Sequence, residues 1–115
     1  MKSLILFILC IMLISCSTNK KEDPLSKIES VQIDLPSMVC GSCSKTIQKA
    51  IYQVEGVKGV DVNLEKKIVQ VKYVPFQTNL EVIETAVTEA GYDANNRKRN
   101  PDAYQKLDAC CKIDG

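Results

Sequence analysis

Alternating apolar and polar residues predict three strands in this chain. Every second position is apolar in the runs 31–35, 60–64 and 69–73, and the positions between them are polar. Such alternation is typical of strands that bury one face and leave the other in water. The polar turn Glu65-Lys66-Lys67 joins the second run to the third, so we expect these two strands to form a hairpin.

Two other segments have the apolar spacing of amphipathic helices. The first runs from Cys43 to about Val54, with apolar residues three or four positions apart along one face. The second is predicted to begin at Thr78, because Thr78 and Glu81 have the spacing of a capping box. Gly91 is a good stop for this second helix.

The order of elements along the chain predicts the fold class. Tyr92-Asp93-Ala94 can start a short last strand, which completes the order strand, helix, strand, strand, helix, strand. Clean alternation favours an antiparallel sheet with one wet face, and right-handed crossovers favour the split βαβ arrangement. We therefore predict an α+β, ferredoxin-like βαββαβ fold with a four-stranded antiparallel sheet and two helices on one face. Asn100 and Pro101 then predict a short C-terminal helix through Ala109.

The first sixteen residues have the pattern of an export signal. Lys2 precedes an apolar run at 4–14, which is too short to span a bilayer comfortably. The segment Leu13-Ile14-Ser15-Cys16 resembles a lipobox, in which cleavage before the cysteine leaves Cys16 lipidated at the new N-terminus. An ordinary signal peptide with an incidental cysteine, or an uncleaved anchor, is the alternative.

This pattern predicts both the domain organisation and the location of the protein. We expect a lipoprotein signal peptide at 1–15, a flexible linker at 16–30, a folded domain at 31–96 and a tail at 97–115. A lipid at the mature N-terminus would hold the protein on the membrane of a bacterial cell envelope. The domain would face the periplasm or the cell exterior.

The amino-acid composition limits the kinds of catalytic and metal site that the chain can form. The chain has 115 residues, a net charge of +1, six cysteines and no histidine. Without histidine, neither a Ser-His-Asp triad nor a Cys2His2 zinc site can form. Well-mixed charges give no support for a nucleic-acid partner. Cys10 lies in the expected signal peptide, so two thiol pairs remain besides Cys16: Cys40 with Cys43, and Cys110 with Cys111.

The pair Cys40 and Cys43 lies where the first strand ends and the first helix begins. Gly41 and Ser42 let the backbone turn tightly between them, so that both sulfurs meet at one point. Cys43 falls in the first turn of the helix, where free N–H groups and the helix dipole stabilise an anion. Two thiolates in a chain without histidine predict a site for a soft metal ion, with Cu(I) first, Hg(II) next and Zn(II) as a further candidate.

The segment from Val31 to about Asn95 resembles the heavy-metal-associated domain family. The family includes bacterial copper chaperones, the N-terminal modules of metal-pumping ATPases and periplasmic mercuric-ion-binding proteins. The resemblance implies a βαββαβ fold and metal binding with handover rather than catalysis. It also implies a partner, either a metal-transporting membrane protein or another metal-binding domain. The matching residues are Met38, Cys40 and Cys43 in an M-x-C-x-x-C loop, Val54-Glu55-Gly56-Val57, and Ala90-Gly91-Tyr92.

Four other residues are candidates around this loop. Met38 is expected to anchor the loop in the core, with a role as thioether ligand as the alternative. Tyr92 resembles the aromatic residue that packs beside the site in bacterial members of the family, or is a plain core aromatic. Cys110 and Cys111 depart from the family pattern. They could return across the domain and add metal ligands or relay metal, or they could be exposed thiols without a role or paired with another chain.

Two other functions fit the paired cysteines. A thioredoxin-like thiol–disulfide oxidoreductase also places C-x-x-C between a strand and a helix. The lack of a Trp before Cys40 and the order of elements oppose that reading. A non-transferring, metal-sensing lipoprotein is the second alternative. In an exported protein, a structural disulfide between Cys40 and Cys43 is the simplest non-metal explanation.

Overall fold

The computed structural model describes residues 23–113. The expected signal peptide, Cys16 and the rest of the expected linker up to residue 22 lie outside the described residues. Within them, no helix is both long and apolar enough to cross a membrane. The elements, in chain order, are η2 (Pro24–Ser26), β1 (Glu29–Asp34), α2 (Gly41–Tyr52), β2 (Val57–Asn63), β3 (Ile68–Tyr73), α3 (Leu80–Glu89), α4 (Pro101–Gln105) and η3 (Ala109–Cys111), where η marks a 3-10 helix.

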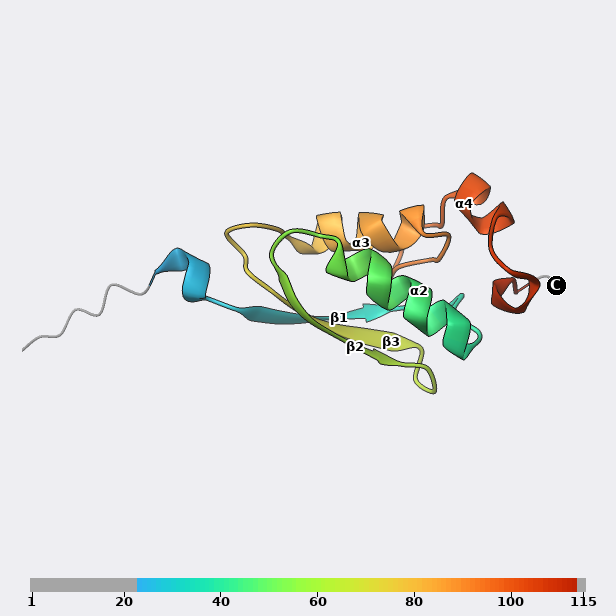
Figure 1. Cartoon of the computed structure of the whole chain (residues 1–115), viewed down its shortest axis with the longest axis horizontal. Helices are drawn as coiled ribbons and strands as arrows, with labels where there is room; N and C mark the ends of the chain where they lie inside the picture. Colours follow the sequence, from blue (N-terminus) through green and yellow to red (C-terminus); the bar gives the residue numbers. More distant parts are fainter. Residues whose placement is uncertain (1–22, 114–115) are drawn as a thin grey trace, which may run out of the picture.

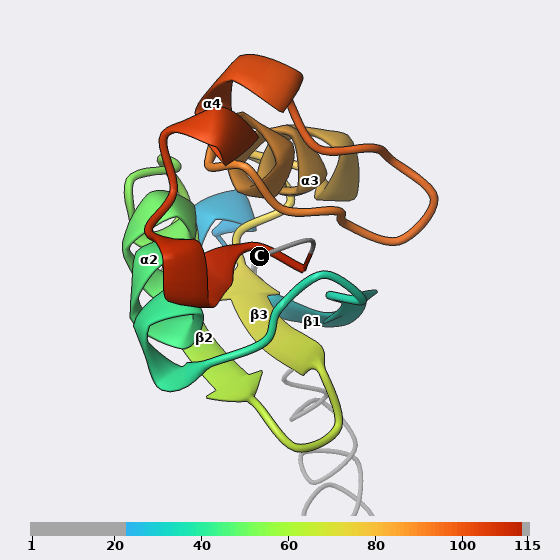
Figure 2. The ribbon, with the colours of Figure 1, turned by 90° about the vertical axis from the view of Figure 1, so that its right-hand side faces the viewer.

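The three predicted strands form one antiparallel sheet in the order β1-β3-β2. In the register, Ile33 of β1 and Val62 of β2 both lie opposite Val69 of β3. The apolar positions of all three strands therefore share one face, and α2 and α3 pack on that face (Figures 1 and 2). The predicted hairpin is confirmed, and its turn ends at Lys67 in a left-handed conformation with φ 54°.

The core lies between this face of the sheet and the two helices. Each element contributes the apolar positions that its period predicts, at every second residue in strands and every third or fourth in helices. Residues from the loops that carry the thiols complete it. The core consists of Ile33, Leu35, Met38, Cys43, Ile47, Ile51, Val69, Val71, Ile83, Val87, Tyr92, Ala94 and Cys111.

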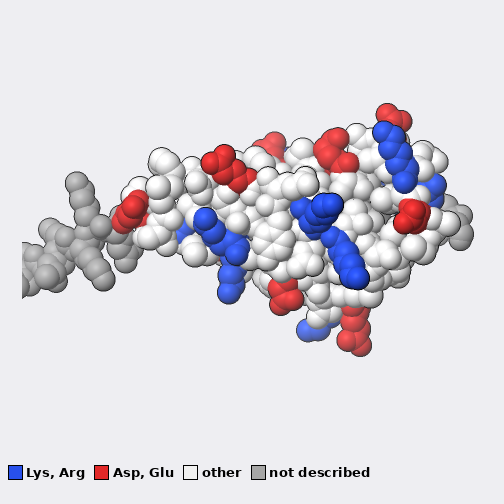
Figure 3. All heavy atoms as spheres, viewed as in Figure 1, with Lys and Arg blue, Asp and Glu red and all other residues white. Residues whose placement is uncertain are grey.

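Positive and negative side chains are interspersed over the surface. Figure 3 shows Lys and Arg beside Asp and Glu along the whole visible face, with no broad area of one sign. This distribution agrees with the net charge of +1.

The predicted start of the second helix is wrong by one residue. Asn79, not Thr78, caps α3, because the Asn79 side chain accepts a hydrogen bond of 3.0 Å from the Val82 N–H. Thr78 is buried, and its hydroxyl has no hydrogen-bond partner among the described residues. An asparagine caps a helix as well as a threonine does, so the chain could bury Thr78 without losing the cap.

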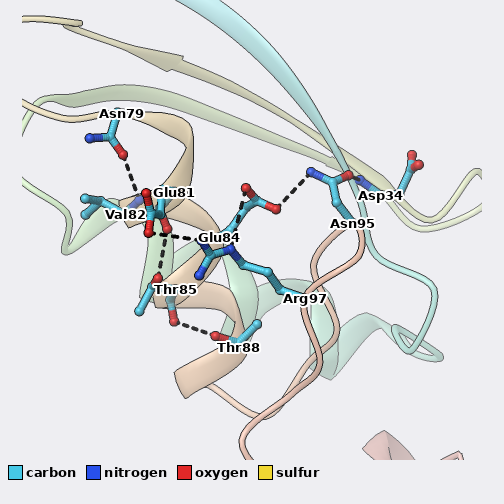
Figure 4. Close-up of polar contacts among 9 residues, drawn as sticks. All are labelled: Asp34, Asn79, Glu81, Val82, Glu84, Thr85, Thr88, Asn95 and Arg97. Atoms are coloured by element: carbon cyan, nitrogen blue, oxygen red, sulfur yellow. Dashed lines mark hydrogen bonds and ion pairs between the residues drawn. The ribbon is translucent and has the colours of Figure 1, made fainter.

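The predicted fourth strand is also wrong within the described residues. The segment after α3 makes only an isolated bridge, between Ala94 and Arg97. Asn95 is left-handed, with φ 52°, and such a residue cannot continue a strand. Instead, the Asn95 N–H donates to the Asp34 carbonyl at 2.9 Å, and the Asp34 N–H donates to Asn95 Oδ1 at 2.8 Å. We call this pair of hydrogen bonds the Asn95 clasp (Figure 4).

The segment that contains Asn95 contacts α3 as well as β1. The side-chain amide of Asn95 donates to Glu84 at 3.3 Å, and Arg97 forms ion pairs with Glu81 at 3.2 Å and with Glu84 at 3.9 Å. These contacts hold the segment at the end of β1, where the fourth strand was expected (Figure 4).

The C-terminal helix begins as predicted and ends earlier. The Asn100 side chain accepts hydrogen bonds from the N–H groups of Asp102 and Ala103, at 2.9 and 3.2 Å, and Pro101 is the first helical residue. The helix was expected to continue through Ala109, but α4 ends at Gln105 and a separate 3-10 helix follows. The break allows Leu107 to pack against the core and Cys111 to enter it.

Replacing Asn95 with Ala should lower the free energy of unfolding by about 2 kcal/mol. About half of this loss comes from the side-chain hydrogen bonds, and half from placing alanine in the left-handed region, which asparagine tolerates better because its polar side chain can hydrogen-bond locally. Urea denaturation measures the change. Asn95→Gly is the matched control, since it keeps the backbone freedom and should lose only about 1 kcal/mol. Equal losses in the two variants would show that the left-handed backbone contributes nothing.

Candidate functional site

The loop between β1 and α2 ends in two thiols. Cys40 is the cap residue of α2, with an extended backbone, and its side chain is half-buried. Cys43 lies in the first turn of α2 and is buried in the core. Their Sγ atoms are 3.1 Å apart. The strand-to-helix junction thus brings both sulfurs to one point, with Cys40 on the outer side.

The tail brings two more thiols to this point. The Sγ atoms of Cys110 and Cys111 lie 3.7 and 3.5 Å from that of Cys40, and 3.9 Å from each other. Figures 1 and 2 show η3, which carries these thiols, beside the first turn of α2. All four cysteines are free thiols. The structure therefore brings together all four cysteines that the sequence singled out in the domain and tail, while their role as metal ligands stays a prediction.

Met38 and Tyr92, the two predicted supporting residues, lie in the core beneath the loop. Both side chains are 0% exposed. The burial of Met38 agrees with its proposed role as an anchor of the loop. The Tyr92 hydroxyl is buried and has no hydrogen-bond partner among the described residues. Burial raises the pKa of Tyr92, and the neighbouring Cys111 and Cys43 thiols raise it further.

Ser37 is a supporting residue that sequence reasoning missed. Its side chain is buried, and its hydroxyl accepts a hydrogen bond of 2.9 Å from the Asp93 N–H. This bond joins the loop that carries Cys40 to the segment that carries Tyr92. A serine in a loop gives no sequence signal for such a contact, because the partner lies 56 residues away.

Cys40, Cys110 and Cys111 differ in acidity because their surroundings differ. The Cys43 thiol, followed by the Cys43 backbone amide, lowers the pKa of Cys40 to about 6. The neighbouring Cys40 side chain raises the pKa of Cys110. Burial raises the pKa of Cys111, and the Cys43 thiol raises it further. Cys40 is therefore largely a thiolate near neutral pH, while the pKa values of Cys110 and Cys111 are raised.

The arrangement fits a soft metal ion. Sulfur donors select thiophilic ions such as Cu(I), and the chain has no histidine to offer a harder site. The buried Tyr92 hydroxyl provides a second indication. A neutral thiol is a weak hydrogen-bond acceptor, whereas a metal-bound thiolate is a strong one, so metal binding would supply the acceptor that this hydroxyl lacks.

The rate of Cys40 alkylation should rise through about pH 6 and level off above pH 7. The thiolate is the nucleophile, so a lowered pKa moves the rise to lower pH. Initial rates with iodoacetamide, measured by peptide mass mapping of the metal-free reduced chain, provide the test. Cys110 is the internal control, because its raised pKa should keep its rate rising above pH 8. Parallel curves for the two residues would contradict the assignment.

Comparison with known proteins agrees with this site. The model of the heavy-metal-associated domain matches residues 32–93. The copper-exporting P-type ATPase of Staphylococcus aureus (strain Newman) is 33% identical over 75 residues, which are 65% of this chain and 9% of that protein. This chain thus spans less than a tenth of the ATPase.

Two solved structures share the fold over nearly their whole length. Oxidized MerP from Ralstonia metallidurans CH34 is 33% identical with a TM-score of 0.58, covering 60% of this chain and 96% of MerP. The CopZ metallochaperone is 29% identical with a TM-score of 0.56, covering 57% of this chain and 98% of CopZ. The matched segment contains Cys40 and Cys43 and ends before the tail thiols. This chain belongs to the heavy-metal-associated domain family.

Proposed function

We propose that this chain binds a soft metal ion through Cys40 and Cys43 and passes it to or from a protein partner. The observation that carries the proposal is a thiol pair 3.1 Å apart, in a domain of the heavy-metal-associated family, whose outer member has a pKa of about 6. Thiolates prefer Cu(I) and Hg(II) to harder ions. Cu(I) is the first candidate because one relative is a copper-exporting ATPase, and Hg(II) and Zn(II) follow.

Handover follows from the small number of ligands that the loop provides. Two protein sulfurs leave coordination positions of the metal open to a thiolate of the partner. Transfer then proceeds stepwise: a partner thiolate forms one metal–sulfur bond, and one thiolate of this chain leaves. Within the loop pair, Cys40 is the cysteine that a partner can reach, because Cys43 is buried and Cys40 is half-exposed.

The partner follows from the same chemistry. It must present thiolates of its own, as a metal-transporting membrane protein or another metal-binding domain does. The metal is cargo rather than a resident cofactor, so the chain acts as a carrier and not as an enzyme. Membership of the heavy-metal-associated family and similarity to the CopZ metallochaperone support this proposal over a thioredoxin-like oxidoreductase.

Replacing both Cys40 and Cys43 with Ser should abolish tight one-to-one metal binding. The measurement is mass spectrometry of the reduced protein with Cu(I), Hg(II) and Zn(II) in competition. Ser42→Ala is the matched control, since it changes the same loop without removing a sulfur, and it should bind metal as the unchanged chain does. Far-UV circular dichroism checks that the double variant is folded. Tight one-to-one binding retained by a folded double variant would refute the proposed site.

We also propose that a lipid on Cys16 holds the protein on the bacterial cell envelope, with the domain facing the periplasm or cell exterior. The apolar run at 4–14 and the lipobox-like segment that ends at Cys16 support the proposal. A carrier held at the membrane would meet a membrane transporter at high local concentration.

Cys16→Ser should move the protein from the membrane fraction to the soluble fraction, because the acyl chains are lost. Immunoblotting of the two fractions after a high-salt wash provides the measurement. Cys10→Ser is the matched control: it removes a cysteine from the expected signal peptide, and the protein should stay on the membrane. A Cys16→Ser protein that remains on the membrane after the wash would show that the lipid is not the anchor.

A further inference from the structure

We propose that Cys110 and Cys111 are additional metal ligands, which close the Cys40–Cys43 site from outside and give it three or four sulfurs. This inference rests on the proposed function and adds to it. The heavy-metal-associated match ends at residue 93, so the tail is a feature of this chain outside the matched domain.

The distances among the sulfurs fit a shared ion. Cys40, Cys110 and Cys111 have Sγ–Sγ distances of 3.5, 3.7 and 3.9 Å, and these three atoms form a potential metal-binding group. With metal–sulfur bonds of about 2.3 Å, sulfurs of a tetrahedral site are about 3.8 Å apart, and those of a trigonal site about 4.0 Å. The three sulfurs therefore need to move by only a few tenths of an ångström. Cys43, 3.1 Å from Cys40, is the fourth candidate ligand.

The tail is packed in place rather than loosely near the site. A Cβ atom at Gly91 would lie 3.1 Å from the Ala103 carbonyl carbon, the Tyr104 nitrogen and the Leu107 side chain, so the tail rests directly on this glycine. The Tyr104 hydroxyl accepts a hydrogen bond of 3.0 Å from the Ile113 N–H, two residues after Cys111. These contacts fix the chain on both sides of the two tail thiols.

Two other contacts strengthen the packing of the tail. The Arg99 guanidinium stacks over the Tyr104 ring at 3.8 Å, and Cys111 is only 4% exposed. A buried thiol of this kind behaves as part of the core, so the thiols of the loop and the tail are held together by packing before any metal binds.

The buried Tyr92 hydroxyl is an independent observation that points to a ligand. This hydroxyl has no partner among the described residues, and the Cys43 and Cys111 thiols are its neighbours. A tyrosine hydroxyl is a hydrogen-bond donor. A metal-bound thiolate at Cys111 or Cys43 would be a strong acceptor for it, whereas a neutral thiol is a weak one.

The four thiols differ in exposure, and this order suggests how metal enters. Cys110 is exposed, Cys40 is half-buried, and Cys43 and Cys111 are buried. A partner thiolate reaches Cys110 first, and the sulfur of Cys110 lies 3.7 Å from that of Cys40, to which the metal can then pass. A closed site binds more tightly than an open one and exchanges more slowly, so the tail favours holding the ion until a partner displaces Cys110.

X-ray absorption of the Cu(I)-loaded protein counts the sulfur ligands directly. The protein is the full chain in detergent, kept reduced, with Cys10→Ser and Cys16→Ser so that only four thiols remain. We expect three or four sulfurs, and two when Cys110→Ser and Cys111→Ser are added. Cu(I) affinity, measured against a competing chelator, should fall at least about tenfold, since even outer partners of a metal site typically contribute that much. Ala109→Ser, in the same 3-10 helix, is the matched control and should change neither result.

The outcomes separate this inference from the proposed function. The inference would be overturned if the metal had two sulfur ligands and the same affinity with and without the tail thiols. In that case, loss of binding in the Cys40→Ser, Cys43→Ser protein would still support the loop site. Tight binding by that loop variant would overturn the proposed function itself. Cys110→Ser alone removes an exposed side chain and should leave the fold unchanged. Loss of one sulfur in this variant would support the tail site even if the double tail variant misfolds, and no loss would overturn it.

Discussion

The arrangement of the site depends on the chain turning sharply at Gly91. Its φ of +100° lets α3 end there, so that Tyr92 enters the core beneath the thiols. Its missing side chain lets the backbone of α4 pack closely, because a Cβ at this position would lie only 3.1 Å from atoms of Ala103 and Tyr104. Gly91 thus sets the position of Tyr92 beneath the site and the position of the tail that covers the site. The positive φ of Gly91 and its missing side chain do not involve the thiols directly. They act by placing Tyr92 and the tail around the thiols.

Sequence reasoning predicted the parts of the fold that depend on local periodicity. The alternation around Ile33 and Val69 indicated strands with one buried face, and the spacing of Ile47 and Ile51 indicated a helix, because each pattern reflects burial on a single face. The position of Cys40 between the first strand and the first helix could be predicted too, because the patterns on either side of it mark where the strand ends and the helix begins. These predictions needed no knowledge of distant contacts.

The features that could not be predicted depend on contacts between distant residues. Whether Thr78 or Asn79 caps α3 depends on which of them is buried, and both are good capping residues. The Asn95 clasp depends on Asp34, 61 residues earlier in the chain. The position of Cys111 depends on how the tail packs beside Gly91. Sequence reasoning therefore allowed the tail to return to the loop thiols but could not show that it does.

The Asn95 clasp explains why the tail can reach the thiols. A full fourth strand of five residues would have carried the chain about 17 Å along β1, away from the metal loop, before it could turn back. The clasp satisfies the two backbone groups of Asp34 and ends the pairing there, so the chain reverses between Ala94 and Arg97 at the same end of the domain. The nine residues 101–109 then suffice to bring Cys110 to Cys40. Residues that would otherwise form a fourth strand are thus available to the tail that covers the site.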